Sequence, residues 1–77
     1  MVIFTSAEDA AEHVNATTIS GDKFELAISN DVTIAGQPDA AGAGMAIIVD
    51  GILAQGYLPD GFEQRDGYRL YSYVPME

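Results

Sequence analysis

The stretch DAAGAGMAIIVDGILAQ, residues 39–55, contains almost nothing polar. The fold class of the whole 77-residue chain depends on the structure that this stretch adopts. Helix signals stand at both of its ends. Pro38 suits a first helical turn, because its φ angle is already close to the helical value and its missing N–H would have no partner there. Gly56 suits a left-handed helix terminus, and Pro59 follows soon after it. The stretch therefore predicts a helix over residues 40–55.

Three interpretations of this helix compete. A membrane span needs about 20 mostly apolar residues, but Asp50 would then lie in mid-bilayer at a cost of about 2.5–3.5 kcal/mol, and no basic flanks orient the helix. A phosphate-binding loop needs a lysine after its glycines, whereas Met45 and Ala46 follow Gly44. We favour a helix buried against a sheet. In this interpretation Gly42, Gly44 and Ala46 allow a neighbouring element to approach closely.

Charge is the most informative bulk property of the sequence. It has 12 Asp and Glu against 3 Lys and Arg, a net charge of −9, and a hydrophobic content of 48%, which is too high for a disordered acidic tail. We therefore expect a single compact domain over residues 1–77 with an acidic surface. Such a surface repels nucleic acids and attracts basic protein surfaces. No cysteine, secretory signal or convincing membrane span is recognisable, so the cytoplasm is the expected compartment.

The rest of the chain predicts a short helix and several strands. Thr5 and Glu8 fit the capping box of a helix N-terminus. A stripe of small residues follows at helical spacing: Ala7, Ala10, Ala11 and Val14. Residues 24–28 alternate between apolar and polar, which predicts a strand in a hairpin with residues 17–19. Residues 1–5 are either a short edge strand or a disordered start, and residues 32–34 are a further candidate strand.

The clearest local signal is Asp66-Gly67, the preferred two-residue hairpin turn, between two strand-like arms. It places Phe62 opposite Tyr71 and Gln64 opposite Arg69. The expected fold class is α+β. The sheet is expected to be antiparallel, with four or five strands built from hairpins, one long apolar helix packed on it and one short N-terminal helix at its side.

No catalytic or metal-binding constellation is recognisable. His13 is the only histidine, and it has no Cys or Ser partner at a spacing that would form a triad. Acids at a helix start more often cap the helix or increase solubility than bind a metal, so we expect no metal. Because the sequence also offers no catalytic set, we expect no enzyme and no cofactor. Asp50 is expected to face outward at the helix edge or to accept a hydrogen bond. It and Gln55 are the residues of the apolar helix expected to seek water.

The charge favours a protein-binding function. An array of carboxylates can replace nucleic-acid phosphates in a basic groove of a partner and block it, with an attraction that weakens in salt. We expect the partner to be a nucleic-acid-binding protein, with no direct contact to nucleic acid or membrane. The candidate partner-binding residues are Glu8, Asp9, Glu12, Asp22, Glu25, Asp31, Asp60, Glu63 and Asp66.

Pro38-Asp39-Ala40, the helix end at Gly56 and the hairpin over residues 63–73 form a compact helix-then-hairpin order in a small, acidic, cysteine-free chain. In this overall character the chain resembles small acidic phage-encoded inhibitors, such as anti-CRISPR proteins that imitate DNA. The resemblance includes no diagnostic motif and transfers no site residues. It implies an inhibitor that acts in the cytoplasm of a host cell.

Two alternatives stay open. The apolar helix and the C-terminal hairpin could instead form a self-assembly interface, including a homodimer, with the acids only maintaining solubility. The domain could also come from a salt-adapted host, whose proteins have few lysines and many acids. A salt-adapted domain should gain stability at molar salt. A self-assembling module should run as an oligomer without any partner.

Overall fold

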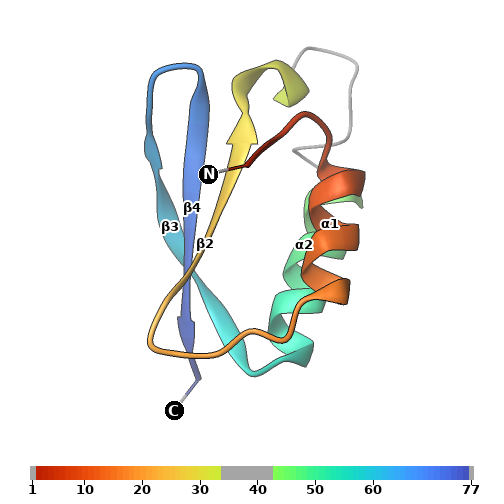
Figure 1. The fold of residues 1–77 in the computed structure, drawn as a ribbon, viewed down its shortest axis with the longest axis vertical. Helices are drawn as coiled ribbons and strands as arrows, with labels where there is room; N and C mark the ends of the chain where they lie inside the picture. The colour runs from red at the N-terminus through yellow and green to blue at the C-terminus, as the bar shows by residue number, and fades with distance from the viewer. Residues whose placement is uncertain (1, 34–42, 77) are drawn as a thin grey trace.

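The computed structural model describes residues 2–33 and 43–76, which form two layers, with two helices on one side of a four-stranded sheet (Figure 1). The elements in chain order are β1 (Ile3–Phe4), α1 (Ala7–Ala16), β2 (Phe24–Ser29), the 3₁₀ helix η1 (Asn30–Thr33), α2 (Ala43–Ala54), β3 (Tyr57–Gln64) and β4 (Tyr68–Pro75). The sheet order is β1-β2-β4-β3. The predicted α+β class is confirmed.

The prediction of a purely antiparallel sheet is wrong, because β1 pairs with β2 in parallel. The other two strand pairs, β2–β4 and β4–β3, are antiparallel. Parallel neighbours need a crossover, and α1 together with the loop after it provides that crossover here. Figure 1 shows α1 running along the sheet and the loop returning at the far end to start β2.

The hairpin predicted between residues 17–19 and residues 24–28 does not form, because no strand is present before Phe24 in this part of the chain. The backbone N–H of Ile19 instead donates to Oε1 of Gln55, at 2.8 Å. The Gln55 side chain also donates from Nε2 to the carbonyl oxygen of Val14, at 2.9 Å. Gln55 therefore fixes the loop after α1 and is only partly exposed, which corrects the expectation that it seeks water.

The strand predicted at residues 32–34 is also not present where the structure describes it, because residues 30–33 form η1. Residue 34 lies outside the described residues. A hydrogen bond from the Asp31 N–H to the Ser29 hydroxyl, at 3.2 Å, supports the turn at the end of β2. A serine side chain that bonds the backbone two residues on favours such turns over continued strand.

The buried face of α1 is the one that the stripe of small residues predicts. Ala7, Ala10 and Val14 are completely buried. Ser6 caps the helix, because its hydroxyl accepts the N–H of Asp9 at 3.0 Å. The capping-box prediction had assigned the cap one residue earlier, at Thr5, and it is wrong on that point.

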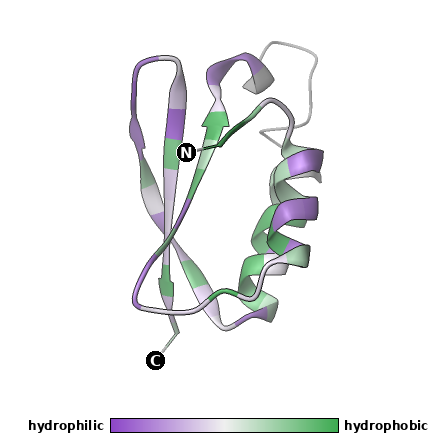
Figure 2. Ribbon diagram, viewed as in Figure 1, coloured by the Kyte–Doolittle hydropathy of each residue, from purple (hydrophilic) through white to green (hydrophobic). Residues whose placement is uncertain are grey.

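α2 packs beside α1 and not only on the sheet. Ile48 and Ile52 of α2 are fully buried. The two helices approach closely at Gly51, where a β-carbon would meet the side chains of Val14 and Asn15. The predicted close contact through Ala46 is wrong, since Ala46 is exposed, and Gly42 lies outside the described residues. In Figure 2 α2 is coloured mostly hydrophobic, whereas α1 shows hydrophilic bands.

The C-terminal hairpin has the predicted register, with Phe62 opposite Tyr71 and Gln64 opposite Arg69. Because successive side chains alternate across a strand, Arg69, Tyr71 and Tyr73 point to the helix side of the sheet. Tyr73 is 1% exposed and belongs to the core. β3 is an edge strand with a register shift after Pro59, a device that discourages further strand addition.

Candidate functional site

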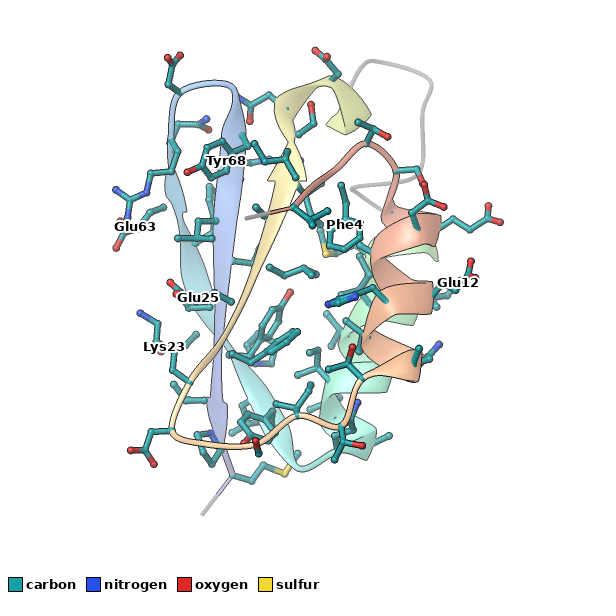
Figure 3. All side chains as sticks on the ribbon, in the orientation of Figure 1. Phe4, Glu12, Lys23, Glu25, Glu63 and Tyr68 are labelled. Atoms are coloured by element: carbon teal, nitrogen blue, oxygen red, sulfur yellow. The ribbon has the colours of Figure 1, made fainter. Side chains whose placement is uncertain are left out.

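The nine carboxylates predicted to bind a partner do not share one face. They lie on α1 (Glu8, Asp9, Glu12), before and within β2 (Asp22, Glu25), in η1 (Asp31), on β3 (Asp60, Glu63) and in the β3–β4 turn (Asp66). All of them are exposed. Figure 3 shows Glu12 on the outer side of α1, with Glu25 and Glu63 on the opposite side of the molecule. The structure therefore does not gather the nine carboxylates on one face, and the three on α1 share one helix.

The positive charges are distributed unevenly between the two layers. Neither α1 nor α2 contains a lysine or an arginine. The three cations of the chain, Lys23, Arg65 and Arg69, all lie on the strands or in the loops next to them. The acidic side chains of the helix layer therefore have no lysine or arginine on their own helix. His13 of α1 is the one residue of a basic type there.

On the sheet layer, two of the predicted carboxylates are paired. Arg65 lies 2.6 Å from Glu63, and Lys23 lies 3.6 Å from Glu25. All four side chains are substantially exposed, so each pair stabilises the fold little. The pairs nevertheless reduce the net charge on this side, and they make Glu25 and Glu63 weaker candidates for attracting a basic partner.

On the helix layer, the exposed carboxylates are Glu8, Asp9, Glu12 and Asp50, which we call the helix-layer carboxylates. Within residues 2–33 and 43–76 none of them forms an ion pair. Asp50 is exposed on α2, the helix that packs against α1 at Gly51. Asp50 was not among the predicted partner-binding residues. An outward position was one of the two expectations for Asp50 from the sequence, and it was the signal that could have identified this residue.

Helix stability explains some of these four acids but not all. Glu8 and Asp9 lie in the first turn of α1, where the helix dipole favours a carboxylate by about 0.3–1 kcal/mol. Glu12 lies beyond that turn, and its spacing of four residues from Glu8 makes a like-charge pair that destabilises a helix by about 0.2–0.5 kcal/mol. Asp50 lies in the second half of α2. Glu12 and Asp50 therefore stand where the helices gain nothing from a negative charge.

An apolar groove lies between α2 and β3. It has a volume of about 220 Å³ and is lined by Met45 and Val49 of α2, by Pro59, Gly61 and Phe62 of β3, and by Tyr71 and Tyr73 of β4. Phe62 is 55% exposed and its ring contacts that of Tyr71, with centroids 5.2 Å apart. Burial, with the neighbouring Tyr71 adding to it, raises the pKa of the Tyr73 phenol to about 12. The groove walls are therefore uncharged at neutral pH.

A second hollow, of about 240 Å³, lies beside β1. It includes Phe4 and His13, whose rings are in contact with centroids 5.1 Å apart. His13 is exposed and its ring packs against that of Phe4. In the part of the chain that the structure describes, no group of three or more His, Cys, Asp or Glu side chains is placed to hold a metal ion.

No helix among the described residues is both long enough and apolar enough to cross a membrane. Comparison with known protein families, with curated proteins and with solved structures found no match to this chain.

Proposed function

We propose that this chain is an acidic protein-binding module that inhibits a partner by occupying its basic nucleic-acid-binding site. The observation that supports the proposal is the absence of lysine and arginine from the two helices, since acids are exposed on both layers. The helix layer presents four exposed carboxylates and no lysine or arginine, whereas Lys23 and Arg65 offset acids on the sheet layer. The helix layer is therefore the proposed binding face.

The positions of Glu12 and Asp50 support the same face. Because a negative charge at these two positions does not stabilise the helix, each carboxylate can bind a cation of a partner without loss of helix stability. A helix surface also spaces charges in a repeating way, since residues four apart stand about 5–6 Å apart at their β-carbons. An array of that kind offers a basic groove several negative charges in a row, as a nucleic-acid backbone does.

Competition with nucleic acid tests the proposal. The chain is immobilised, incubated with a nuclease-treated lysate of the cells in which it acts, and washed, and each captured protein is purified. Each purified partner is then bound to a labelled oligonucleotide and titrated with the free chain. The expected result is displacement of the oligonucleotide, with a displacement constant that weakens as salt increases. A partner that binds the chain and the oligonucleotide at the same time would contradict the proposal.

Self-assembly is the second candidate, and specific side chains favour it. Ile47, Leu53 and Phe62 are exposed on α2 and β3 at 54%, 38% and 55%. A net charge of −9 on each copy opposes association of two copies at low salt. Sedimentation at several salt concentrations separates the two candidates, because self-association of like-charged copies strengthens with salt whereas capture of a basic partner weakens.

A further inference from the structure

We infer that the groove between α2 and β3 receives a single apolar side chain from a basic segment of the partner protein. The inference rests on the proposed protein-binding function and adds a second contact to it. The helix-layer carboxylates attract the partner, and the groove fixes its position. Protein interfaces commonly combine a central apolar residue in a pocket with a polar surround in this way.

The size of the groove limits its occupant. Its volume of about 220 Å³ is below the roughly 300–1,000 Å³ of sites that take drug-sized ligands. At about 30 Å³ for each water-sized unit, it holds about seven such units. One large aliphatic or aromatic side chain has that size.

The lining of the groove determines the chemistry of that side chain. Met45 and Val49 form one wall, Phe62 forms the opposite wall, and the Tyr71 ring contributes to the sheet side of the groove. The nearest cation, Arg69, does not line the groove, and it donates to the Tyr71 hydroxyl at 2.7 Å. The Tyr71 hydroxyl therefore keeps this partner when an apolar group enters the groove.

Two exposed acids are next in sequence to residues that line the groove, and we expect them to select the sequence around that side chain. Asp50 follows Val49 on α2, and Asp60 stands between Pro59 and Gly61 on β3. Both carboxylates are exposed, and neither forms an ion pair with any residue that the structure describes. Lysine or arginine residues on either side of the inserted side chain would face them. This charge complementarity favours a basic partner segment over a second copy of the chain, whose own acids would meet these two.

Two capped peptides provide the probe, Lys-Lys-Phe-Lys-Lys and Lys-Lys-Ser-Lys-Lys, each titrated into the full chain at low salt and followed by NMR. We expect the Phe peptide to bind at least about fivefold more tightly than the Ser peptide, because only its ring is removed from water in the groove. The backbone amides of Val49, Phe62 and Tyr71 should shift with the Phe peptide. Equal affinity of the two peptides would overturn the inference.

Variants of one strand supply a matched control. Phe62→Ala removes a groove wall, whereas Leu58→Ala shortens a side chain of similar exposure, 42% against 55%, on the other face of β3. Phe62→Ala should remove the preference for the Phe peptide and Leu58→Ala should retain it. Asp50→Asn with Asp60→Asn should weaken both peptides more than Asp22→Asn with Asp66→Asn does. Dimerisation of the wild-type chain that Phe62→Ala abolishes would assign the groove to a second copy and contradict the inference.

The inference and the proposed function can fail separately. If neutralising the helix-layer carboxylates abolishes capture of the partner while Phe62→Ala leaves its affinity unchanged, the function stands and the groove inference falls. If the captured partner shows no competition with nucleic acid, the proposed function falls, whatever the peptides do in the groove.

Discussion

A β-carbon built on Gly51 of α2 would stand 2.8 Å from Oδ1 of Asn15 on α1. The same β-carbon would lie 3.1 Å from Cγ1 of Val14, which is fully buried. The exposed Asn15 side chain can rotate away, but Val14 is enclosed by the core. An alanine at this position would therefore require Val14 to shift by a few tenths of an ångström, and glycine allows the two helices to pack this closely without that shift.

Gly51→Ala tests this contact. Alanine improves helix propensity by about 1 kcal/mol, while overpacking costs about 1–3 kcal/mol. Because Val14 cannot move freely, we expect a net loss of about 1 kcal/mol in the free energy of unfolding, measured with urea. In an Asn15→Ala background the loss should be smaller but not absent. A stabilised Gly51→Ala variant would mean that α1 and α2 separate without penalty.

Gln55→Ala is expected to destabilise the fold by about 1–3 kcal/mol, because it removes the only hydrogen-bond partner shown for the Ile19 N–H among the described residues. It also removes one of two donors to the Val14 carbonyl, which still accepts the Thr17 N–H at 3.3 Å. Asn15→Ala, at an exposed position nearby, should have little effect. Hydrogen exchange at the Ile19 amide gives the local readout. Unchanged protection of that amide in Gln55→Ala would show that the side chain does not hold the loop.

The N-cap of α1 can be assigned by two single substitutions. Ser6→Ala should lower the free energy of unfolding by about 1 kcal/mol, since it removes the acceptor of the Asp9 N–H. Thr5→Ala should change it by less than about 0.5 kcal/mol. Urea denaturation of the two variants decides between the positions, and a larger effect at Thr5 would restore the cap that the sequence predicts.

The buried Tyr73 phenol predicts a loss of stability in alkaline solution. Its pKa is raised from 10.0 to about 12 in the folded chain, so the folded state holds its proton where the unfolded state releases it. The contribution of the protonated Tyr73 phenol to the free energy of unfolding is complete below about pH 10, and it is lost as the pH rises towards about 12. Tyr73→Phe should flatten this part of the stability profile.

Urea denaturation at several pH values across that range measures the effect. Burial also raises the pKa of Tyr71, with Arg69 opposing the shift, so a smaller dependence should remain in Tyr73→Phe. Because the Tyr73 hydroxyl has no hydrogen-bond partner among the described residues, the substitution should not destabilise the fold at neutral pH by more than about 1 kcal/mol. If the wild-type chain and Tyr73→Phe lose stability identically with pH, the alkaline loss does not come from Tyr73.

The sequence predicted the local elements whose signals are complete within a few residues. The Asp66-Gly67 turn has its own backbone preference and determined the register of β3 with β4. The alanine stripe of α1 likewise gave its buried face. Both depend on neighbours in the chain, for which spacing alone is informative.

Long-range pairing was not predictable in the same way. β1 is too short to show an alternation, so its parallel pairing with β2 left no pattern to read. The partner of the Ile19 N–H is a side chain 36 residues away, and no local rule connects the two. The same limit applies to charge, because a count of acids cannot show that Lys23 and Arg65 offset Glu25 and Glu63.

The most direct test of the central claim compares two triple variants of equal charge. Glu8→Gln, Glu12→Gln and Asp50→Asn change the helix layer, and Glu25→Gln, Glu63→Gln and Asp66→Asn change the sheet layer, each moving the net charge from −9 to −6. Affinity for the captured partner is measured across a range of salt concentrations. The helix-layer variant should bind more weakly and show the smaller salt dependence, while the sheet-layer variant stays close to wild type. Equal losses in both variants would show that only total charge matters and would contradict a binding face on α1 and α2.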